Sequence, residues 1–475
     1  MNASRLAELL GGVHDGSGPA YRALADGVRV LVADGRLPAG TRLPAERALA
    51  EALRVSRITV THAYRELRRD GWAEARHGAG TWARLPDGPF RTDGVWAPEP
   101  ERAGVIDLAH AAPPALDGMP LLVRRAVDRL DVELTGHGYG PEGLPAFRAR
   151  IAERYTARGA PTDPGQIVVT SGALHAIGTA VAELTGPGDR VLVEHPTYPS
   201  ALDVLADAGA RAVPVALDRD PPADALPRAA RQTAARAAYV MADFQNPTGV
   251  LLDDDARARL LQRLSRLDVV AIVDETFAEL DLRDAPEGPL PCAAHAPRPD
   301  DVVTVGGLSK VAWGGLRLGW IRAAREPAAR MRRRLARAQI APPVLEQLIG
   351  VEVFDALDGL LDERRRLLRE RRDALVGLLA EEFPGWRVRP PDGGLALWCD
   401  LGEPVSSALA AVAPRHGLLL APGPRFGLGR AFDDRLRLPL THPVPVLAEA
   451  VRRLRRAYDD VGSGAAAGMR PELVV

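Results

Sequence analysis

Residues 106 to 458 repeat one pattern, in which a short apolar run is followed by a segment long enough to form a helix. The apolar runs read QIVVTSG, RVLVEH, AAYVMA, VVAIVDE and DVVTVGG. A buried strand that is followed by a helix returns to its sheet in the same direction, so strands of this kind pair in parallel. The pattern predicts an α/β domain with a mainly parallel central sheet, whose strands end at one common edge.

The rest of the chain divides around this domain. A chain of 475 residues exceeds the size at which a single core stops growing, so we expect more than one domain. Residues 86–105 are rich in proline, glycine and charge and lack an apolar period, which is typical of a linker. The last residues, VGSGAAAGMRPELVV, predict a disordered tail. We therefore predict a domain at 1–85, a linker at 86–105, the α/β domain at 106–460 and a tail at 461–475.

Composition limits the class of protein. The first residues, MNASRLAELLGGVHDG, lack the basic start, apolar run and cleavage site of a secretory signal, and no run of about 18 apolar residues follows. The two cysteines, Cys292 and Cys399, are far apart and outside any spacing that holds a metal. We expect a cytoplasmic protein without a membrane partner or a metal site.

The N-terminal region has the pattern of a small helical domain. Apolar residues at helical spacing predict helices between residues 18 and 35, over 46–53, and over 57–69 with Ser56 as N-cap. WAEAR and TWAR then predict a β-hairpin around residues 77–80. Residues 1–86 hold 13 arginines against 9 acidic residues, so a small basic excess is confined to this end. Three helices followed by a hairpin form a winged helix-turn-helix.

The third helix carries arginines opposite its apolar stripe, a face that either meets DNA phosphates or is simply solvated. The surrounding segment, LPAERALAEALRVSRITVTHAYRELRRDGWAEARHGAGTWA, resembles the DNA-binding domain of the GntR regulators at nearly every position. In that family the helix after VSR enters the major groove and the wing touches the minor groove. The resemblance implies that double-stranded promoter DNA is a partner. The implied contacts are Arg47, Ser56, Arg57, Thr59, Thr61, His77, Gly78 and Gly80.

Of the 61 lysine and arginine residues, Lys310 alone is a lysine. Arginine supplies positive charge elsewhere, but it cannot lose its proton near neutral pH and form a Schiff base with an aldehyde. Asn246 and Asp274 follow two other predicted strands, so an amide, a carboxylate and an amine are expected to meet at the sheet edge. Pyridoxal phosphate (PLP) needs these three groups for its phenolic oxygen, its ring nitrogen and its aldehyde.

A phosphate site is also expected, between the strand QIVVT and the helix that follows it. Free backbone N–H groups at the start of a helix bind anions. The candidate phosphate ligands are Ser171, Gly172 and Ala173, completed by Ser309 and Arg317 on either side of the lysine.

Residues 106–458 resemble the class I and II aminotransferases of PLP fold type I. The matching pieces are GYGPEGLPAFR, TSGALHAI, HPTYPSA, FQNPTG, DETF, LSKVAWGGLRLGW and RLRLPL. The resemblance implies that Lys310 forms the internal aldimine, Asp274 pairs with the pyridine nitrogen and Asn246 donates to the phenolic oxygen. It also implies that Tyr198 stacks on the ring, and that Tyr139 reaches the phosphate of a neighbouring subunit in a homodimer.

In this family an arginine near the C-terminal end holds the α-carboxylate of an amino acid in a bidentate contact. Arg437 aligns best with it, and Arg435 lies two residues away. The chain departs from the family twice: Phe277 stands where a tyrosine commonly donates to the phenolic oxygen, and Gly307 where a hydroxyl is common. The loss of a donor favours binding over turnover.

A GntR-type domain joined by a linker to an aminotransferase-like domain resembles the MocR subfamily of bacterial regulators. The resemblance implies a PLP-dependent transcriptional regulator whose large domain senses PLP or a small amino compound and changes the grip on DNA through the linker. The alternative is a working aminotransferase that also binds DNA, because Asn246, Asp274, Lys310 and Arg437 form a complete set. A third interpretation gives the small domain a role in assembly only. We expect no efficient turnover.

Overall fold

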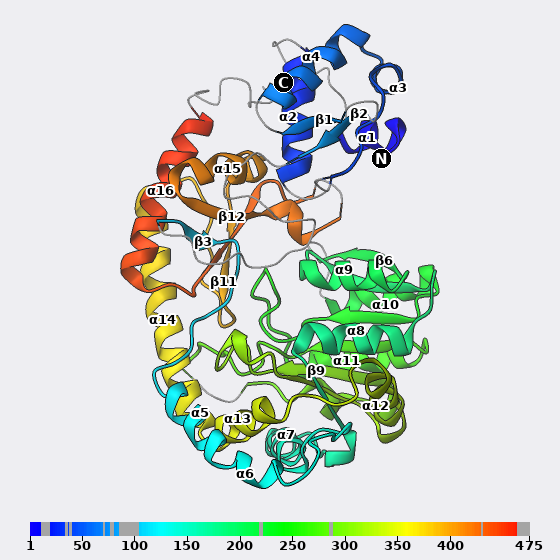
Figure 1. Ribbon diagram of the computed structural model, residues 1–475, viewed down its shortest axis with the longest axis vertical. Helices are drawn as coiled ribbons and strands as arrows, with labels where there is room; N and C mark the ends of the chain where they lie inside the picture. The colour runs from blue at the N-terminus through cyan, green and yellow to red at the C-terminus, as the bar shows by residue number, and fades with distance from the viewer. Residues whose placement is uncertain are drawn as a thin grey trace.

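The computed structural model describes residues 1–10, 20–33, 37, 40–69, 72–76, 80–84, 104–217, 222–284, 288–428 and 431–462. It shows an N-terminal domain, a large α/β domain and a C-terminal subdomain around a second sheet (Figure 1). Most of the predicted linker and tail lies outside the described residues. Within the described ranges, no helix is both long and apolar enough to cross a membrane.

The N-terminal domain contains α1 (Ala3–Leu10), α2 (Ala20–Ala33), α3 (Glu46–Leu53) and α4 (Arg57–Arg69), followed by the antiparallel hairpin of β1 (Ala73–Arg76) and β2 (Gly80–Ala83). The three predicted helices and the hairpin are confirmed. The apolar stripe of α4 is buried, and Thr59 N donates to Ser56 Oγ at 3.1 Å, as an N-cap requires. The additional helix α1 was not predicted; Leu6 and Leu10, one turn apart, bury it in the shared core.

The large domain is built on a seven-stranded sheet with the order β4, β10, β9, β8, β7, β5, β6. The five predicted strands are β4 (Ile167–Thr170), β5 (Arg190–His195), β7 (Ala237–Val240), β8 (Val270–Asp274) and β9 (Val302–Gly307). Two strands escaped prediction: β6 (Arg211–Ala216) is a largely unburied edge strand, and β10 (Gly319–Arg322) has only four residues. Because β10 alone runs antiparallel to its neighbours, the sheet is mainly parallel, as predicted.

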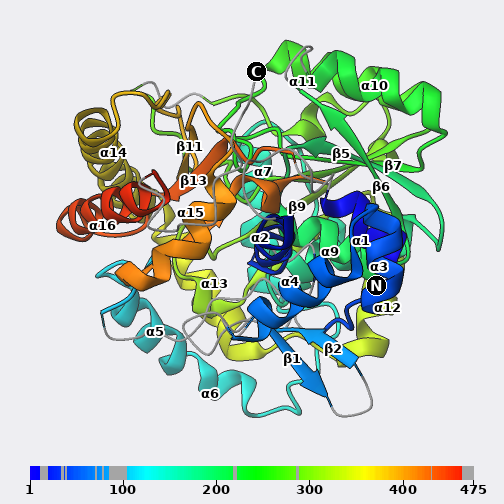
Figure 2. The same cartoon turned by 90° about the horizontal axis from the view of Figure 1, so that it is seen from above.

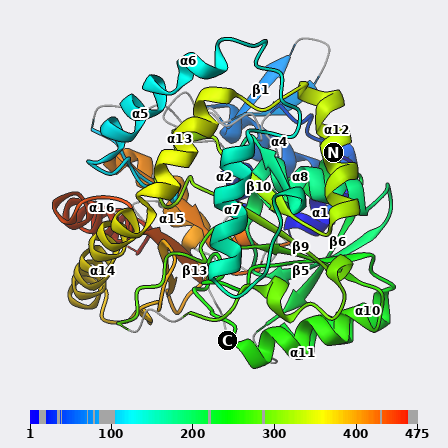
Figure 3. The same ribbon diagram turned by 90° about the horizontal axis from the view of Figure 1, so that it is seen from below.

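Helices cover both faces of this sheet. On one face α8 (Ala173–Leu184), α9 (Pro199–Asp207) and α12 (Arg325–Gln339) pack into the largest core. On the other face lie α10 (Pro222–Thr233), α11 (Asp254–Ser265) and α7 (Pro145–Ala157). The helix α13 (Val344–Asp355) packs on α7 and on α5 (Met119–Asp128), which is followed by α6 (Leu130–Glu133) (Figure 3).

A second sheet of four strands lies in the C-terminal subdomain, in the order β11 (Ala396–Asp400), β13 (Arg435–Pro439), β12 (Leu418–Pro422) and β3 (Ile106–Leu108). The first strand, β3, pairs in parallel with β12 from the far end of the domain. The long helix α14 (Leu357–Glu382) runs from the large domain to this sheet, beside α16 (Val444–Gly462) (Figure 1). This sheet was not predicted, because its strands are three to five residues long and pair with distant segments.

The N-terminal domain rests on the C-terminal subdomain. Its helix α2 contacts α15 (Ser406–Val412), and Ala411 of α15 packs against the helical core (Figure 2). In turn α15 packs on β12, the neighbour of β3. A continuous path of packed elements therefore connects the N-terminal domain with the segment that follows β3.

Candidate functional site

Three of the candidate residues lie at the carboxyl ends of adjacent strands. Asp274 is the last residue of β8, Lys310 follows β9, and Asn246 follows β7. The strands β9, β8 and β7 are neighbours in the sheet and run in the same direction. The amine, the carboxylate and the amide therefore lie at one edge of the sheet.

Lys310 is partly buried in the turn after β9, and its Nζ donates to the carbonyl oxygen of Ala111 at 2.7 Å. Burial lowers the pKa of this amine from 10.5 to about 8, because the charged form loses its hydration. The guanidinium groups of Arg437 and Arg317 contribute to this lowering of the pKa, and the carboxylate of Asp274 opposes it. The amine therefore has an appreciable neutral fraction near neutral pH, and the neutral form is the nucleophile.

Asp274 is fully buried and held by three donors. Its Oδ2 accepts from the hydroxyl of Tyr239 at 2.7 Å, and its Oδ1 accepts from Thr276 N at 3.0 Å and Thr276 Oγ1 at 2.7 Å. Burial raises the pKa of the carboxyl, while these hydrogen bonds and the charge of Lys310 lower it. Sequence reasoning missed Tyr239 and Thr276; the one available signal was a tyrosine inside the apolar run AAYVMA.

Gln245 joins the loops that carry Asn246 and Tyr198. Its Nε2 donates to Pro196 O at 2.7 Å, and its Oε1 accepts from Thr248 N at 3.0 Å and Thr248 Oγ1 at 2.7 Å. Asn246 itself is buried. Tyr198 is partly buried; burial raises its pKa, and the charges of Asp274, Arg437 and Arg317 also act on it. Tyr198 therefore lies among the charged groups of the site.

The start of α8 forms a cradle with a guanidinium beside it. Gly172 stands at the N-cap with φ +91° and without a side-chain cap. Arg317 Nη2 donates to Ser171 O at 3.2 Å, and a Cβ at position 172 would lie 2.9 Å from this nitrogen. Glycine is therefore favoured here by the positive φ, and a side chain at this position would displace the end of Arg317. Ala173 begins the helix, and Ser309 is partly buried next to Lys310.

Arg437 and Arg435 have different environments on β13. Arg437 is buried: its Nη2 donates to Ala109 O, its guanidinium lies 4.9 Å from the ring centre of Phe426, and its Nε has no hydrogen-bond partner. Burial lowers the pKa of Arg437 to about 10. Arg435 instead forms an ion pair with Asp400 at 2.8 Å. Arg437 therefore has a buried donor that no protein group uses, whereas Arg435 is engaged by Asp400.

These groups fit PLP. An amine with a lowered pKa, a buried carboxylate and a buried amide match its aldehyde, ring nitrogen and phenolic oxygen. The helix start beside Arg317 matches its phosphate. The unpartnered Nε of Arg437 leaves a donor for the carboxylate of an amino compound.

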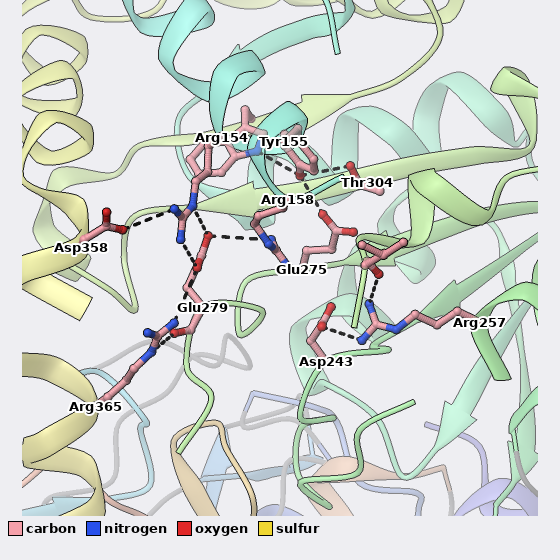
Figure 4. Close-up of polar contacts among 12 residues, drawn as sticks. Arg154, Tyr155, Arg158, Asp243, Arg257, Glu275, Glu279, Thr304, Asp358 and Arg365 are labelled. Carbon is pink, nitrogen blue, oxygen red and sulfur yellow. Dashed lines mark hydrogen bonds and ion pairs between the residues drawn. The ribbon is translucent and has the colours of Figure 1, made fainter. Parts of the chain in front are cut away.

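A buried polar network supports the segment after Asp274 on the side of α7 (Figure 4). Oε2 of Glu275 accepts from the hydroxyl of Tyr155 at 2.8 Å, and Glu279 accepts two hydrogen bonds from Arg154 at 2.9 and 2.8 Å. The network also includes Arg158, Asp243, Arg257, Thr304, Asp358 and Arg365. These contacts connect the segment after β8 to α7 and α14. They therefore restrict the movement of Asp274, the last residue of β8.

The candidate Tyr139 and the two departures from the family pattern, Phe277 and Gly307, lie in different surroundings. Tyr139 is 64% exposed beside His137 in a surface groove, outside the group formed around Lys310. Phe277 is buried in the main core, and a phenyl ring offers no donor. Gly307 faces the phosphate cradle, since a Cβ there would lie 3.6 Å from Ala173 Cβ.

Most of the candidate DNA contacts, Ser56, Arg57, Thr59 and Thr61, lie at the start of α4, and Arg47 lies on the preceding helix α3. Arg47 and Arg57 are exposed, and the hydroxyls of Ser56 and Thr59 lie 2.8 Å apart. Thr61 Oγ1 donates to Glu46 at 2.7 Å, so this hydroxyl is engaged within the domain.

The wing and one apolar side chain complete this surface. His77 and Gly78 lie outside the described residues, whereas Gly80 begins β2 with φ +96°. A Cβ at position 80 would lie 3.3 Å from Arg42 Nε, so Arg42 stands beside the wing. Sequence reasoning missed Arg42, whose place depends on strand pairing, and Ile58, which is 68% exposed at the start of α4.

Comparison with known proteins places both halves of the chain. Residues 103–454 match the aminotransferase class I and II family, and residues 20–82 match the bacterial regulatory proteins of the gntR family. The HTH-type transcriptional regulator YdcR of Escherichia coli K12 is 30% identical over 443 residues, covering 88% of this chain and 94% of YdcR. The probable rhizopine catabolism regulatory protein MocR of Rhizobium meliloti is 28% identical over 412 residues, covering 81% of this chain and 82% of MocR.

A solved structure also resembles the large domain. The α-aminoadipate aminotransferase LysN of Thermus thermophilus, complexed with N-(5'-phosphopyridoxyl)-L-leucine, superposes with a TM-score of 0.68 at 27% identity, covering 76% of this chain and 94% of LysN. The aminotransferase match spans most of this chain, and the likeness to YdcR extends across both halves. The chain therefore belongs to the class I and II aminotransferase family and, with its GntR-type domain, to the MocR subfamily of GntR regulators.

Proposed function

We propose that this chain reads promoter DNA through its N-terminal domain and senses PLP, or an amino compound that reacts with PLP, through Lys310. The observation that carries the proposal is the union of a winged helix-turn-helix with a sheet edge where the only lysine of the sequence has a lowered pKa. The aminotransferase fold implies PLP as the cofactor.

Each residue at the sheet edge has a defined task in this proposal. PLP, when bound, supplies an aldehyde and an electron-withdrawing ring. Lys310 provides the amine that captures the aldehyde, Asp274 holds a proton on the ring nitrogen, and Asn246 donates to the phenolic oxygen. The remaining contacts are Tyr198 on the ring, and Ser171, Gly172, Ala173, Ser309 and Arg317 around the phosphate.

The sensing step rests on two backbone carbonyls. Lys310 donates to Ala111 O and Arg437 donates to Ala109 O, so each cation has a backbone carbonyl as its partner. An aldehyde and a carboxylate compete for these same two cations. Both carbonyls follow β3, which connects through β12 and α15 to α2 of the N-terminal domain. Release of this segment is therefore the step through which ligand binding alters the DNA-binding domain.

The proposal is tested by measuring DNA affinity with and without PLP, using fluorescence anisotropy on DNA from upstream of the gene. PLP is expected to change the affinity of the wild type, whereas Lys310→Ala, which cannot bind Ala111 O, should show one DNA affinity with and without PLP. Borohydride reduction followed by peptide mapping is expected to place the label on Lys310. A label elsewhere, or a PLP response that persists in Lys310→Ala, contradicts the proposal.

We also propose a homodimer. Tyr139 lies in a groove at the surface, on a face that exposes several large apolar side chains. These are Leu121, Val127, Val132, Leu134 and Ile340, with exposed fractions of 47% to 74%. In a dimer this face is covered and Tyr139 reaches the phosphate site of the partner. Sedimentation of the wild type and of Val132→Asp tests this, since a charge on the covered face should favour the monomer.

Transamination is the second candidate function. It is favoured by the same donor set and by the unpartnered Nε of Arg437, which suits the α-carboxylate of an amino acid. Incubation with PLP, a panel of amino acids and a keto acid separates the two functions. Rapid turnover of a common amino acid would place the enzyme ahead of the sensor.

A further inference from the structure

Arg364 on α14 is among the most completely buried side chains of the protein, with no exposed surface. Among the described residues no carboxylate lies within ion-pair distance of it, and its Nη1 has no hydrogen-bond partner. Burial lowers the pKa of this guanidinium to about 10. A buried cation without a counter-charge is costly, so its presence calls for an explanation other than charge pairing.

Arg364 binds the backbone of two segments that meet at Lys310. Its Nε donates to Val311 O at 3.1 Å and its Nη2 donates to Ala312 O at 2.9 Å, so it holds the turn directly after the lysine. The same Nη2 donates to Pro114 O at 2.8 Å, three residues after Ala111. One planar side chain therefore sets the distance between the lysine turn and the segment that carries Ala111 O.

The hydrogen bond from Lys310 to Ala111 O is a second contact between the lysine turn and the segment after β3. The two contacts differ in what a ligand can do to them. Lys310 must leave Ala111 O when it captures an aldehyde, whereas Arg364 lies buried in the protein and keeps its three carbonyls. During that exchange Arg364 is the part of the arrangement that stays in place.

We propose that Arg364 is a positioning residue for ligand capture, which holds the Lys310 turn and the Ala111–Pro114 segment in register so that the amine is presented to the aldehyde. The inference rests on the proposed function, because it requires Lys310 to be the capturing residue. A shift of about 1 Å in a reacting group costs about 100-fold in rate, so the loss of three carbonyl contacts should slow capture about 10- to 100-fold.

The experiment compares Arg364→Met with the matched control Arg371→Met. Arg371 is a buried arginine of the same helix, but its guanidinium donates to Thr441 O at 2.9 Å, away from the lysine turn. Stopped-flow absorbance follows PLP capture, and thermal unfolding follows stability. Arg364→Met is expected to capture PLP 10- to 100-fold more slowly than Arg371→Met. The gap should remain when both are compared at equal distance below their melting temperatures.

A second variant distinguishes an effect of Arg364 on the position of the lysine turn from an effect on folding. Arg364→Gln keeps one amide donor and should capture PLP at a rate between those of the wild type and Arg364→Met; lysine is avoided because it would add a second amine. Equal capture rates in Arg364→Met and Arg371→Met overturn the inference, as does failure of both Arg364 variants to fold while Arg371→Met folds. A wild type that never captures PLP on Lys310 overturns the proposed function instead.

Discussion

The pKa of Lys310 is the quantity on which ligand capture depends. Burial and two guanidinium groups place it at about 8 rather than 10.5. At pH 7 the neutral fraction is then about one tenth, against about one part in 3,000 for an ordinary lysine, a gain of about 300-fold in nucleophile. We predict that the amine titrates with a midpoint near 8 in the protein without PLP.

The single lysine makes this measurement direct. Selective ¹³C labelling of lysine gives one side-chain resonance in the spectrum, because the chain contains no other lysine. Its chemical shift, followed against pH, reports the titration of Lys310 alone. A midpoint near 10.5 would refute the reasoning, because it would show that the amine keeps its hydration.

Three variants test the causes of the shift. Arg437→Leu removes a positive charge and should move the midpoint upward, whereas Asp274→Asn removes a negative charge and should move it downward by less. Arg435→Leu is the matched control, because this arginine lies on the same strand but pairs with Asp400, and the midpoint should stay in place. If Arg437→Leu and Arg435→Leu give equal midpoints, the electrostatic explanation is wrong.

Three further predictions follow from other residues. Burial raises the pKa of Glu194 from 4.5 to about 8, so the folded state binds an extra proton and stability falls as pH rises between these values. Glu194→Gln should therefore raise the melting temperature near pH 8 but not near pH 4.5, and an equal effect at both would contradict this. The family resemblance implies that Phe277→Tyr supplies a donor to the phenolic oxygen of PLP, so this variant should raise transamination about tenfold, the worth of one hydrogen bond of about 1.4 kcal/mol, while DNA affinity stays unchanged. Arg57→Ala should weaken DNA binding for all sequences and reduce its salt dependence by about one unit; an unchanged salt slope would remove Arg57 from the phosphate contacts.

The spacing of apolar residues predicted the helices and strands whose burial depends on neighbouring residues in the sequence. The stripe of α4 and the five apolar strands follow from residue spacing, and the structure has them at those positions. The second sheet depends on pairing between β3 and β12, which lie at opposite ends of the domain, and no short window of sequence contains that information. Helix α1 was missed although Leu6 and Leu10 lie one turn apart on its buried side, so the periodic signal was present there and was overlooked.

The candidate site was likewise predicted only in part from the sequence. Lys310 and Asn246 stood out because their residue types are rare in this chain, and Asp274 because it ends an apolar run. The partners of Lys310 and Arg437, which are Ala111 O and Ala109 O, are backbone atoms that no residue type encodes. They could be found only after the chain had been folded around them.

The contacts to Ala109 O and Ala111 O predict different responses to PLP alone and to a ligand that carries a carboxylate. Capture of an aldehyde by Lys310 takes the amine away from Ala111 O, but it leaves Arg437 on Ala109 O. Only a ligand with a carboxylate competes for Arg437, at the cost of a charged hydrogen bond worth about 1.5–3 kcal/mol.

Wild-type protein loaded with PLP should therefore respond differently in DNA affinity to an amino acid and to the amine that its decarboxylation yields. Arg437→Leu should keep the response to PLP and treat the two compounds alike, while Arg435→Leu should still distinguish them. If the wild type cannot distinguish them, Ala109 is not part of the signal, and the release of Ala111 alone must carry it.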